Sequence, residues 1–116
     1  VFAYAIFLRK NDRMLCSCIA HTFQWDDEKA EIGYWLAGEA EGKGIASEAV
    51  AALEKELFRL GLYRLEIRCD PLNVRSVAVP KRLGYRYEGT LRKDIVEMGQ
   101  RKDSMVWAKL RVESDS

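Results

Sequence analysis

Gly42-Lys43-Gly44 is the first group of residues whose types and spacing could do chemistry, because it lies between an alternating apolar stretch and a helical pattern. Glycine lets the backbone turn tightly and approach a ligand closely. The first amides of a helix have no intrahelical partner and favour negative charge, so phosphate is the natural ligand of such a loop. The alternative is a strand-to-helix turn that needs glycine only for its geometry.

Two known phosphate motifs can be compared with this loop. A P-loop places its lysine after the second glycine, whereas Lys43 lies between the two glycines. The dinucleotide fingerprint fits better, with Ser47 in place of the third glycine and Glu66 about 20 residues further on, where the ribose-binding acid would stand. Because only one strand-helix-strand crossover is predicted, dinucleotide binding is kept as an alternative.

The remaining reactive side chains are few. His21 is the general base that pKa alone would select, but no motif places it in a site. The three cysteines, Cys16, Cys18 and Cys69, form no disulfide or zinc spacing, so we predict a reduced, cytoplasmic protein without a metal site. The formal net charge of +1 does not indicate a nucleic-acid binder, and no apolar run is long enough to indicate a membrane span.

The elements that must position these residues follow from hydrophobic periodicity. Strands are predicted over 2–9, 14–22, 30–36, 64–69, 85–91 and 104–110, and helices over 45–60 and 74–83. Asn73 is a predicted N-cap of the second helix, and the residues around Gly99 are predicted to form a longer loop. The order β-β-β-α-β-α-β-β predicts an α/β (α+β) mixed sheet with one parallel strand pair.

The whole chain, residues 1–116, is predicted to be one domain. It starts without Met and inside an apolar stretch, which suggests a fragment of a larger fold. Residues 1–60 carry 7 Lys and Arg against 10 Asp and Glu, whereas residues 61–116 carry 12 against 8. The C-terminal half therefore favours an anionic ligand.

Several ordered blocks carry a resemblance to a known family. The stretches "EIGYWLAGEAEGKGIASEAV" and "GLYRLEIRCDPLNVRSVAVPKRLGYRYEGTLR" resemble the GNAT superfamily of acyl-CoA N-acetyltransferases, and most closely its RimJ/RimL-like branch of ribosomal-protein N-terminal acetyltransferases. The resemblance extends from the third strand to the final "DSMVWAKL". It implies the GNAT fold, in which the third strand splays from the strand over 64–69 and the gap holds the pantetheine arm of coenzyme A.

The resemblance also implies roles for single residues. Ser76 would protonate the departing thiolate, and Glu31 is the best candidate for the general base. Cys69 would lie near the thiol, although inert packing is the favoured interpretation. Coenzyme A binding is implied for Leu36, Ala37, Glu41, Gly42, Lys43, Gly44, Ile45, Ala46, Ser47 and Asn73.

The sequence departs from the family pattern in two places. Glu41 stands where the family usually has Gln or Arg, and Lys43 partly compensates for its charge. Pro80 lies inside the second helix, where its missing N–H leaves the Ser76 carbonyl without its usual bond, so we expect a disturbed helix there.

The family normally has a strand and two helices before the first hairpin strand, and these are missing here.

The function that the resemblance implies is acetyl transfer from acetyl-CoA to a primary amine, in particular a protein N-terminal α-amine, by direct attack. A non-catalytic acyl-CoA-binding module is the alternative of another class. The expected partners are coenzyme A and the amine acceptor, without nucleic acid or membrane. The branch also leaves a homodimer open, with Trp107 and the last strand as a candidate edge.

Overall fold

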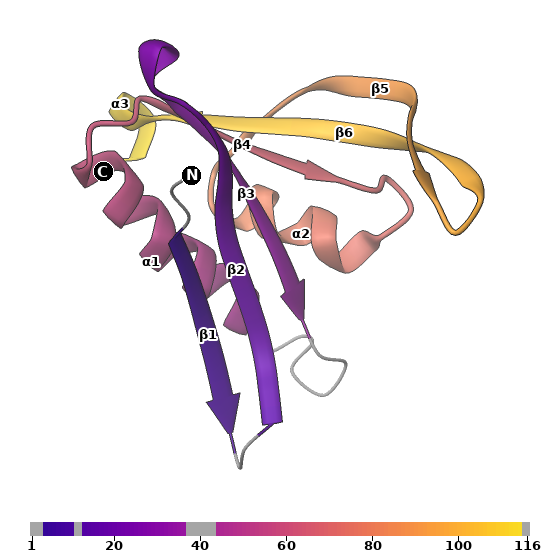
Figure 1. The fold of residues 1–116 in the computed structure, drawn as a ribbon, viewed down its shortest axis with the longest axis horizontal. Coiled ribbons are helices and arrows are strands. Elements are labelled where there is room, and N and C mark those ends of the chain that lie inside the picture. Colours follow the sequence, from indigo (N-terminus) through magenta and orange to yellow (C-terminus); the bar gives the residue numbers. More distant parts are fainter. Residues whose placement is uncertain (1–3, 11–12, 37–43, 115–116) are drawn as a thin grey trace.

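The computed structural model describes residues 4–10, 13–36 and 44–114. Within them, six strands form one sheet in the order β1-β2-β3-β4-β6-β5 (Figure 1). The strands are β1 (Tyr4–Lys10), β2 (Arg13–Gln24), β3 (Lys29–Leu36), β4 (Arg64–Cys69), β5 (Arg86–Glu97) and β6 (Gln100–Leu110). The helical segments are η1 (Trp25–Asp27), α1 (Ile45–Arg59), α2 (Val74–Arg82) and the short α3 (Arg111–Ser114).

Only the β3–β4 pair is parallel among the strand pairs of the described part, so the mixed sheet is confirmed. The last strand is not at an edge, however, and the expectation of an edge at Trp107 is wrong. β6 lies between β4 and β5, with Arg64 of β4 opposite Leu110 of β6. Trp107 is buried at 6% exposure because it faces the core beside Ile67.

Helices α1 and α2 pack on the same face of the sheet, because one apolar cluster joins them to the strands. In α1 the apolar residues recur at spacings of three and four, and this stripe is buried. In the strands, alternate residues such as Ile32, Leu65 and Ile67 face the two helices and are buried against them. Cys16 and Cys18 share this face and are fully buried, as two residues at alternate positions of one strand should be.

One ion pair is buried within this packing. Lys109 of β6 donates a hydrogen bond to Glu54 of α1 over 3.0 Å and another to the Leu83 carbonyl over 2.8 Å. Both side chains are about nine-tenths buried. The ammonium group also lies over the ring of Tyr85, 5.6 Å from its centroid. This pair therefore joins the helical layer to β6, an inner strand of the sheet.

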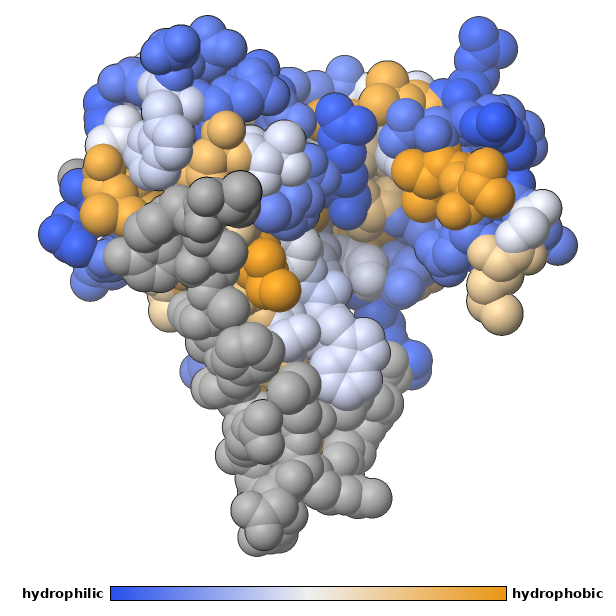
Figure 2. Space-filling view, in the orientation of Figure 1, coloured by the Kyte–Doolittle hydropathy of each residue, from blue (hydrophilic) through white to orange (hydrophobic). Residues whose placement is uncertain are grey.

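The long loop predicted around Gly99 is instead part of a hairpin. β5 continues to Glu97 and β6 begins at Gln100, with Met98 and Gly99 at the turn and φ values of 51° and 78°. Two positive φ values are typical of the tight turns that suit the twist of paired strands. The hairpin extends away from the helices (Figure 1), and an apolar patch is visible among hydrophilic side chains on that side of the molecule (Figure 2).

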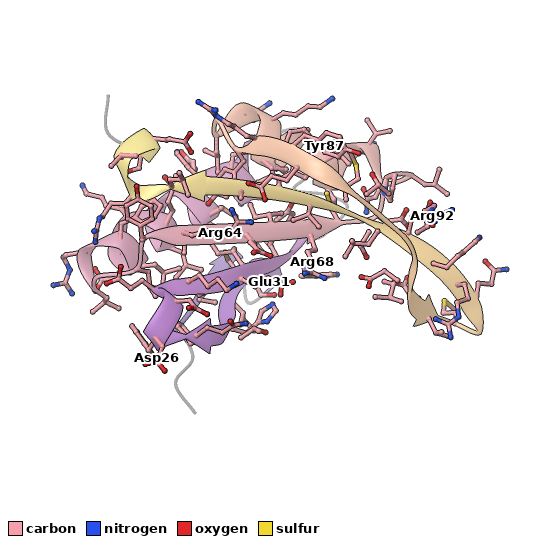
Figure 3. All side chains as sticks on the ribbon, turned by 90° about the horizontal axis from the view of Figure 1, so that it is seen from above. Asp26, Glu31, Arg64, Arg68, Tyr87 and Arg92 are labelled. Carbon is pink, nitrogen blue, oxygen red and sulfur yellow. The ribbon has the colours of Figure 1, made fainter. Side chains whose placement is uncertain are left out.

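The other face of the sheet carries charged side chains. Arg64, Glu66 and Arg68 alternate with the buried residues of β4, and Glu31 of β3 lies opposite Glu66. Figure 3 looks down on these side chains, with Glu31 and Arg68 on neighbouring strands. In the described part of the chain no helix is long and apolar enough to cross a membrane.

Candidate active site

The two parallel strands separate in the middle of the sheet. β3 pairs with β4 from Lys29 to Ile32, opposite Arg64 to Ile67, although β3 continues to Leu36 and β4 to Cys69. Beyond Ile32 the two strands diverge (Figure 1). The predicted splayed pair is therefore present, and among the described strands none pairs with the backbone edge of β3 that faces the gap.

The N-terminus of α1 opens onto one end of this gap. Gly44 is its N-cap with φ of 72°, and the first helical bond joins the Glu48 amide to the Gly44 carbonyl. The amides of Ile45, Ala46 and Ser47 therefore have no acceptor within the helix and can donate to a ligand. Ala37, Glu41, Gly42 and Lys43 lie outside the described residues, as does the side chain of Leu36, so the predicted pyrophosphate loop itself remains a prediction.

A small pocket of about 120 Å³ lies at this helix end, between α1 and α2. The guanidinium of Arg82 reaches it from α2, since a Cβ added to Gly44 would lie 3.2 Å from Arg82 Nη1. Arg75, two turns before Arg82 on α2, lines the same pocket. Sequence reasoning missed both arginines. Their spacing of seven residues on one helix, together with the basic C-terminal half, was the available signal.

A second pocket of about 270 Å³ continues from the first toward the splayed strands. Asn73 lines it and caps α2, with Oδ1 accepting a hydrogen bond from the Ser76 amide over 3.1 Å. The predicted N-cap is therefore confirmed, and the side-chain amide nitrogen of Asn73 can serve as a donor toward the pocket. The full lining is Tyr34, Trp35, Ala46, Asn73, Arg75, Ser76 and Val79.

A third pocket of about 420 Å³ lies on the other side of Ser76. Ser76 and Tyr34 line both the second and the third pocket, so they form the wall where the two meet. Glu31 lines the third pocket as well, so the structure brings together the two predicted catalytic residues. The other lining residues are Arg68, Cys69, Asp70, Asp94, Ile95, Glu97 and Ser104.

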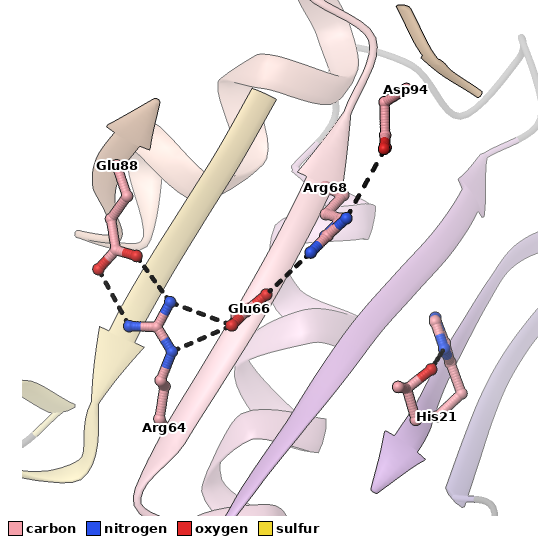
Figure 4. A network of polar contacts seen from close by, with 7 residues as sticks. His21, Arg64, Glu66, Arg68, Glu88 and Asp94 are labelled. Atoms are coloured by element: carbon pink, nitrogen blue, oxygen red, sulfur yellow. Dashed lines mark hydrogen bonds and ion pairs between the residues drawn. The ribbon is translucent and has the colours of Figure 1, made fainter. Parts of the chain in front are cut away.

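Four carboxylates face this third pocket. Asp94 pairs with Arg68 over 3.7 Å, and Lys102 lies 3.4 Å from Asp70 and 3.6 Å from Glu97. Arg68 also approaches Glu66, which joins Arg64 and Glu88 in a continuous network (Figure 4). The lining holds four acids and one cation, Arg68, and acids stay in excess even when Lys102 is counted. The pocket therefore suits a positively charged or amine-bearing ligand.

His21 lies beside this site without lining any of these three pockets. It is opposite Glu31 in the register of β2 and β3, and its Nδ1 shares a 2.8 Å hydrogen bond with the Thr22 hydroxyl. Its ring lies over Gly33, where an added Cβ would be 3.4 Å from Nε2. The side chain is exposed, and Figure 4 draws it apart from the network of Arg64, Glu66 and Arg68. The structure therefore gives no reason to assign it to the chemistry.

Cys69 is buried against the third pocket near Ser76. Burial and then the nearby charge of Asp70 raise the pKa of this thiol from 9.0 to about 11. We expect iodoacetamide to modify Cys69 at pH 8 about a hundredfold more slowly than a free cysteine, since the thiolate is the nucleophile. The rate should rise as pH approaches 11. Peptide mapping by mass spectrometry distinguishes Cys69 from the other thiols, and rapid modification at pH 7 would contradict the raised pKa.

Among residues 4–10, 13–36 and 44–114, no group of three acidic, histidine or cysteine side chains could hold a metal ion.

Together the three adjoining pockets form a trough, with a helix N-terminus and arginines at one end and acids at the other. It could bind a long ligand with an anionic end, placing its far end at Ser76.

Comparison with known proteins agrees with this geometry. Residues 1–86 match the family described as "Acetyltransferase (GNAT) domain". This chain belongs to the GNAT acetyltransferase family.

Three relatives illustrate the similarity. YdaF of Bacillus subtilis (strain 168), provisionally named a ribosomal N-acetyltransferase, is 38% identical over 104 residues, which cover 88% of this chain and 57% of YdaF. The ribosomal-protein-serine acetyltransferase of Escherichia coli (strain K12) is 33% identical over 92 residues, 78% of this chain and 51% of that protein. The chain thus spans between half and three fifths of the length of these curated relatives.

The third is a solved structure of RimL, a ribosomal-protein alpha-N-acetyltransferase, in complex with coenzyme A that is joined to a cysteine by a disulfide. It matches with a TM-score of 0.86 and 26% identity, over 98% of this chain and 64% of the RimL chain. The GNAT-type fold predicted from the sequence is confirmed, and binding of coenzyme A is a property of this fold family.

Proposed function

We propose that this chain forms the cofactor-binding core of an N-acetyltransferase that moves acetyl from acetyl-CoA to a primary amine. We further propose that the amine is a protein N-terminal α-amine. The observation that carries this proposal is the position of Ser76, on the wall shared by a pocket that begins at a helix N-terminus and a pocket lined by acids. The ribosomal-protein names of the relatives support the choice of acceptor.

The trough suggests how acetyl-CoA would lie. The first amides of α1 and the guanidinium of Arg82 would hold the pyrophosphate, together with the predicted loop over 41–43. The pantetheine arm would follow the unpaired edge of β3 past Asn73. Its thioester would then reach Ser76, where a backbone N–H at Leu36 or Ala37 would donate to the oxyanion.

The reaction itself proceeds by attack, proton loss and collapse. A neutral amine nitrogen attacks the thioester carbonyl carbon, which forms the C–N bond and a tetrahedral oxyanion. The amine then loses a proton to Glu31, directly or through water. As the oxyanion collapses, the C–S bond breaks and the coenzyme A thiolate takes a proton from the Ser76 hydroxyl. The proton held by Glu31 then passes through water to the Ser76 oxygen, so both side chains return to their starting state. The products are the acetylated amine and free coenzyme A.

An α-amine suits this site better than a lysine side chain. Its pKa is about 8 against about 10.4 for lysine, so a larger fraction is neutral at physiological pH. The acids around the third pocket would attract a basic N-terminal segment. Peptides with lysine or arginine after the first residue should therefore have a lower KM than peptides with aspartate or glutamate there.

The Gly44→Asp variant tests the phosphate end of the trough. The new carboxylate would accept hydrogen bonds from the same helix amides and repel phosphate, so the Kd for acetyl-CoA should rise by about tenfold or more. Gly44→Asn is the matched control, because asparagine has nearly the size of aspartate, a similar tolerance of positive φ and the same approach to Arg82 without the charge. Calorimetric titration measures both. An equal loss of affinity in the two variants would show that strain, and not charge, weakens binding.

Two alternatives share parts of this site. A dinucleotide-binding domain is not favoured, because the described strands contain one parallel pair and the family match is to an acetyltransferase. A non-catalytic acyl-CoA-binding module would have the same trough without turnover.

We also propose a cytoplasmic location, consistent with three free cysteines, and keep a homodimer as a prediction. We propose no nucleic-acid or membrane partner.

Steady-state release of free coenzyme A tests the proposal. The protein that carries this chain is mixed with acetyl-CoA and, in turn, a peptide with a free α-amine and no lysine, the same peptide with a blocked N-terminus and one lysine, a polyamine and an aminoglycoside. Turnover with the first peptide, and mass-spectrometric acetylation of its N-terminus, is expected. Turnover only with another amine would overturn the acceptor, and binding without any turnover would favour the non-catalytic module.

A further inference from the structure

The carbonyl of Ser76 lacks its ordinary helical partner. In α2 that partner would be the amide of residue 80, but proline has no N–H and its ring crowds the carbonyl four residues earlier. The helix nevertheless continues past Pro80 to Arg82. The half-buried Ser76 carbonyl therefore needs a donor from outside the helix, since an acceptor left without a partner costs free energy.

Tyr34 supplies that group from the splayed strand. Its hydroxyl donates a 2.5 Å hydrogen bond to the Ser76 carbonyl, across 42 positions of the sequence. Tyr34 lies two residues beyond Ile32, the last residue of β3 that pairs with β4. Its ring packs against the core cluster, so the hydroxyl is held at the place where the two strands have separated.

We propose that the Tyr34 hydroxyl replaces the helical amide removed by Pro80 and thereby fixes Ser76 between the two pockets. Tyr34 is in this view a positioning residue, which acts on the reaction through Ser76. Pro80 and Tyr34 form a matched pair, because the proline releases the carbonyl that the tyrosine binds. Burial raises the pKa of Tyr34, so the hydroxyl stays protonated and can donate throughout the physiological range.

A double-mutant cycle tests this pair directly. In Pro80→Ala the new amide can bond the Ser76 carbonyl within the helix, so the Tyr34 hydroxyl becomes dispensable. Tyr34→Phe should lower kcat about tenfold when Pro80 is present, the size of one uncompensated hydrogen bond, with the KM for acetyl-CoA within about twofold. In the Pro80→Ala background the same change should alter kcat by less than about twofold.

Tyr63→Phe is the control, because Tyr63 is half-buried and contacts Arg111 through its ring, which phenylalanine retains. It should leave kcat unchanged in both backgrounds. An equal loss of kcat from Tyr34→Phe with and without Pro80 would overturn the proposal. So would a change confined to KM, which would make Tyr34 a binding residue.

The effect on kcat rests on the proposed function, but the hydrogen-bond exchange does not. The unmodified protein, the two single variants and the double variant are therefore also unfolded with urea. Tyr34→Phe should reduce the folding equilibrium constant about tenfold when Pro80 is present, and by less than about twofold in the Pro80→Ala background. If the protein has no acetyltransferase activity and this coupling is present, the function is wrong and the pairing holds. If the coupling is absent, the pairing is wrong whatever the activity.

Discussion

Ser76→Ala is expected to lower kcat about a hundredfold while the KM for acetyl-CoA changes by less than about twofold. The reason is the position of the Ser76 hydroxyl on the wall shared by the two pockets, where it can protonate the departing thiolate. Alanine keeps the backbone amide that Asn73 caps, so α2 should remain folded. Initial rates at varied acetyl-CoA concentration measure both constants.

Ser17→Ala is the matched control, because Ser17 is a half-buried serine on β2 that lines none of the three pockets. Its kcat should equal that of the unmodified protein. A Ser76→Ala variant with unchanged kcat would remove Ser76 from the chemistry. The thiolate, with its own low proton affinity, would then leave without help.

Lys109→Met is expected to lower the free energy of unfolding by about 3–5 kcal/mol. The substitution removes the cation that Glu54 faces across 3.0 Å and leaves its carboxylate buried without a counter-charge. It also removes the donor to the Leu83 carbonyl at the end of α2. Urea unfolding followed by circular dichroism measures the change.

Two further variants give this result its meaning. Lys109→Met combined with Glu54→Leu should recover much of the loss, because an apolar pair of similar volume fills the same space without a buried charge. Lys55→Met, at the next and exposed position of α1, should change stability by less than about 0.5 kcal/mol. A loss below about 1 kcal/mol in Lys109→Met would mean that Glu54 reaches water in the folded protein.

The elements with a one-sided apolar pattern could be predicted from the sequence. The helix predicted over 45–60 is Ile45–Arg59, and the strand predicted over 64–69 is Arg64–Cys69. Both have one face in the core, so burial imposes the period of a helix or a strand on the residue types. Asn73 was predictable for a local reason, since a cap involves only residues within one turn.

The hairpin of β5 and β6 could not be predicted in the same way. Between Leu91 and Ser104 nearly every side chain is exposed or half-buried on both faces, so charged residues alternate with no apolar period. Its turn uses Met98-Gly99 where Asn-Gly is the usual signal. Several residues of the third pocket, including Asp94 and Glu97, were missed because this stretch was expected to be a loop.

The site was partly predictable for a related reason. Glu31 and Ser76 were named from the family pattern, and the structure places them on one pocket. Tyr34 and Arg82 were not named, because each acts on a residue more than 30 positions away. The spacing of residues along the sequence cannot predict a contact between positions so far apart. Only the packing of α2 against β3 and α1 brings them to Ser76 and Gly44.

The position of β6 between β4 and β5 has a consequence for how the protein is made. β4 is synthesised well before Gln100–Leu110, the segment that becomes its second neighbour. While the chain is still emerging from the ribosome, the backbone of β4 therefore presents an open edge on one side, and Leu65 and Ile67 lack their cross-strand neighbours Lys109 and Trp107. We expect the nascent chain to stay dependent on protection from aggregation until β6 has been translated and inserted, so that a late pause in translation would be more harmful than an early one.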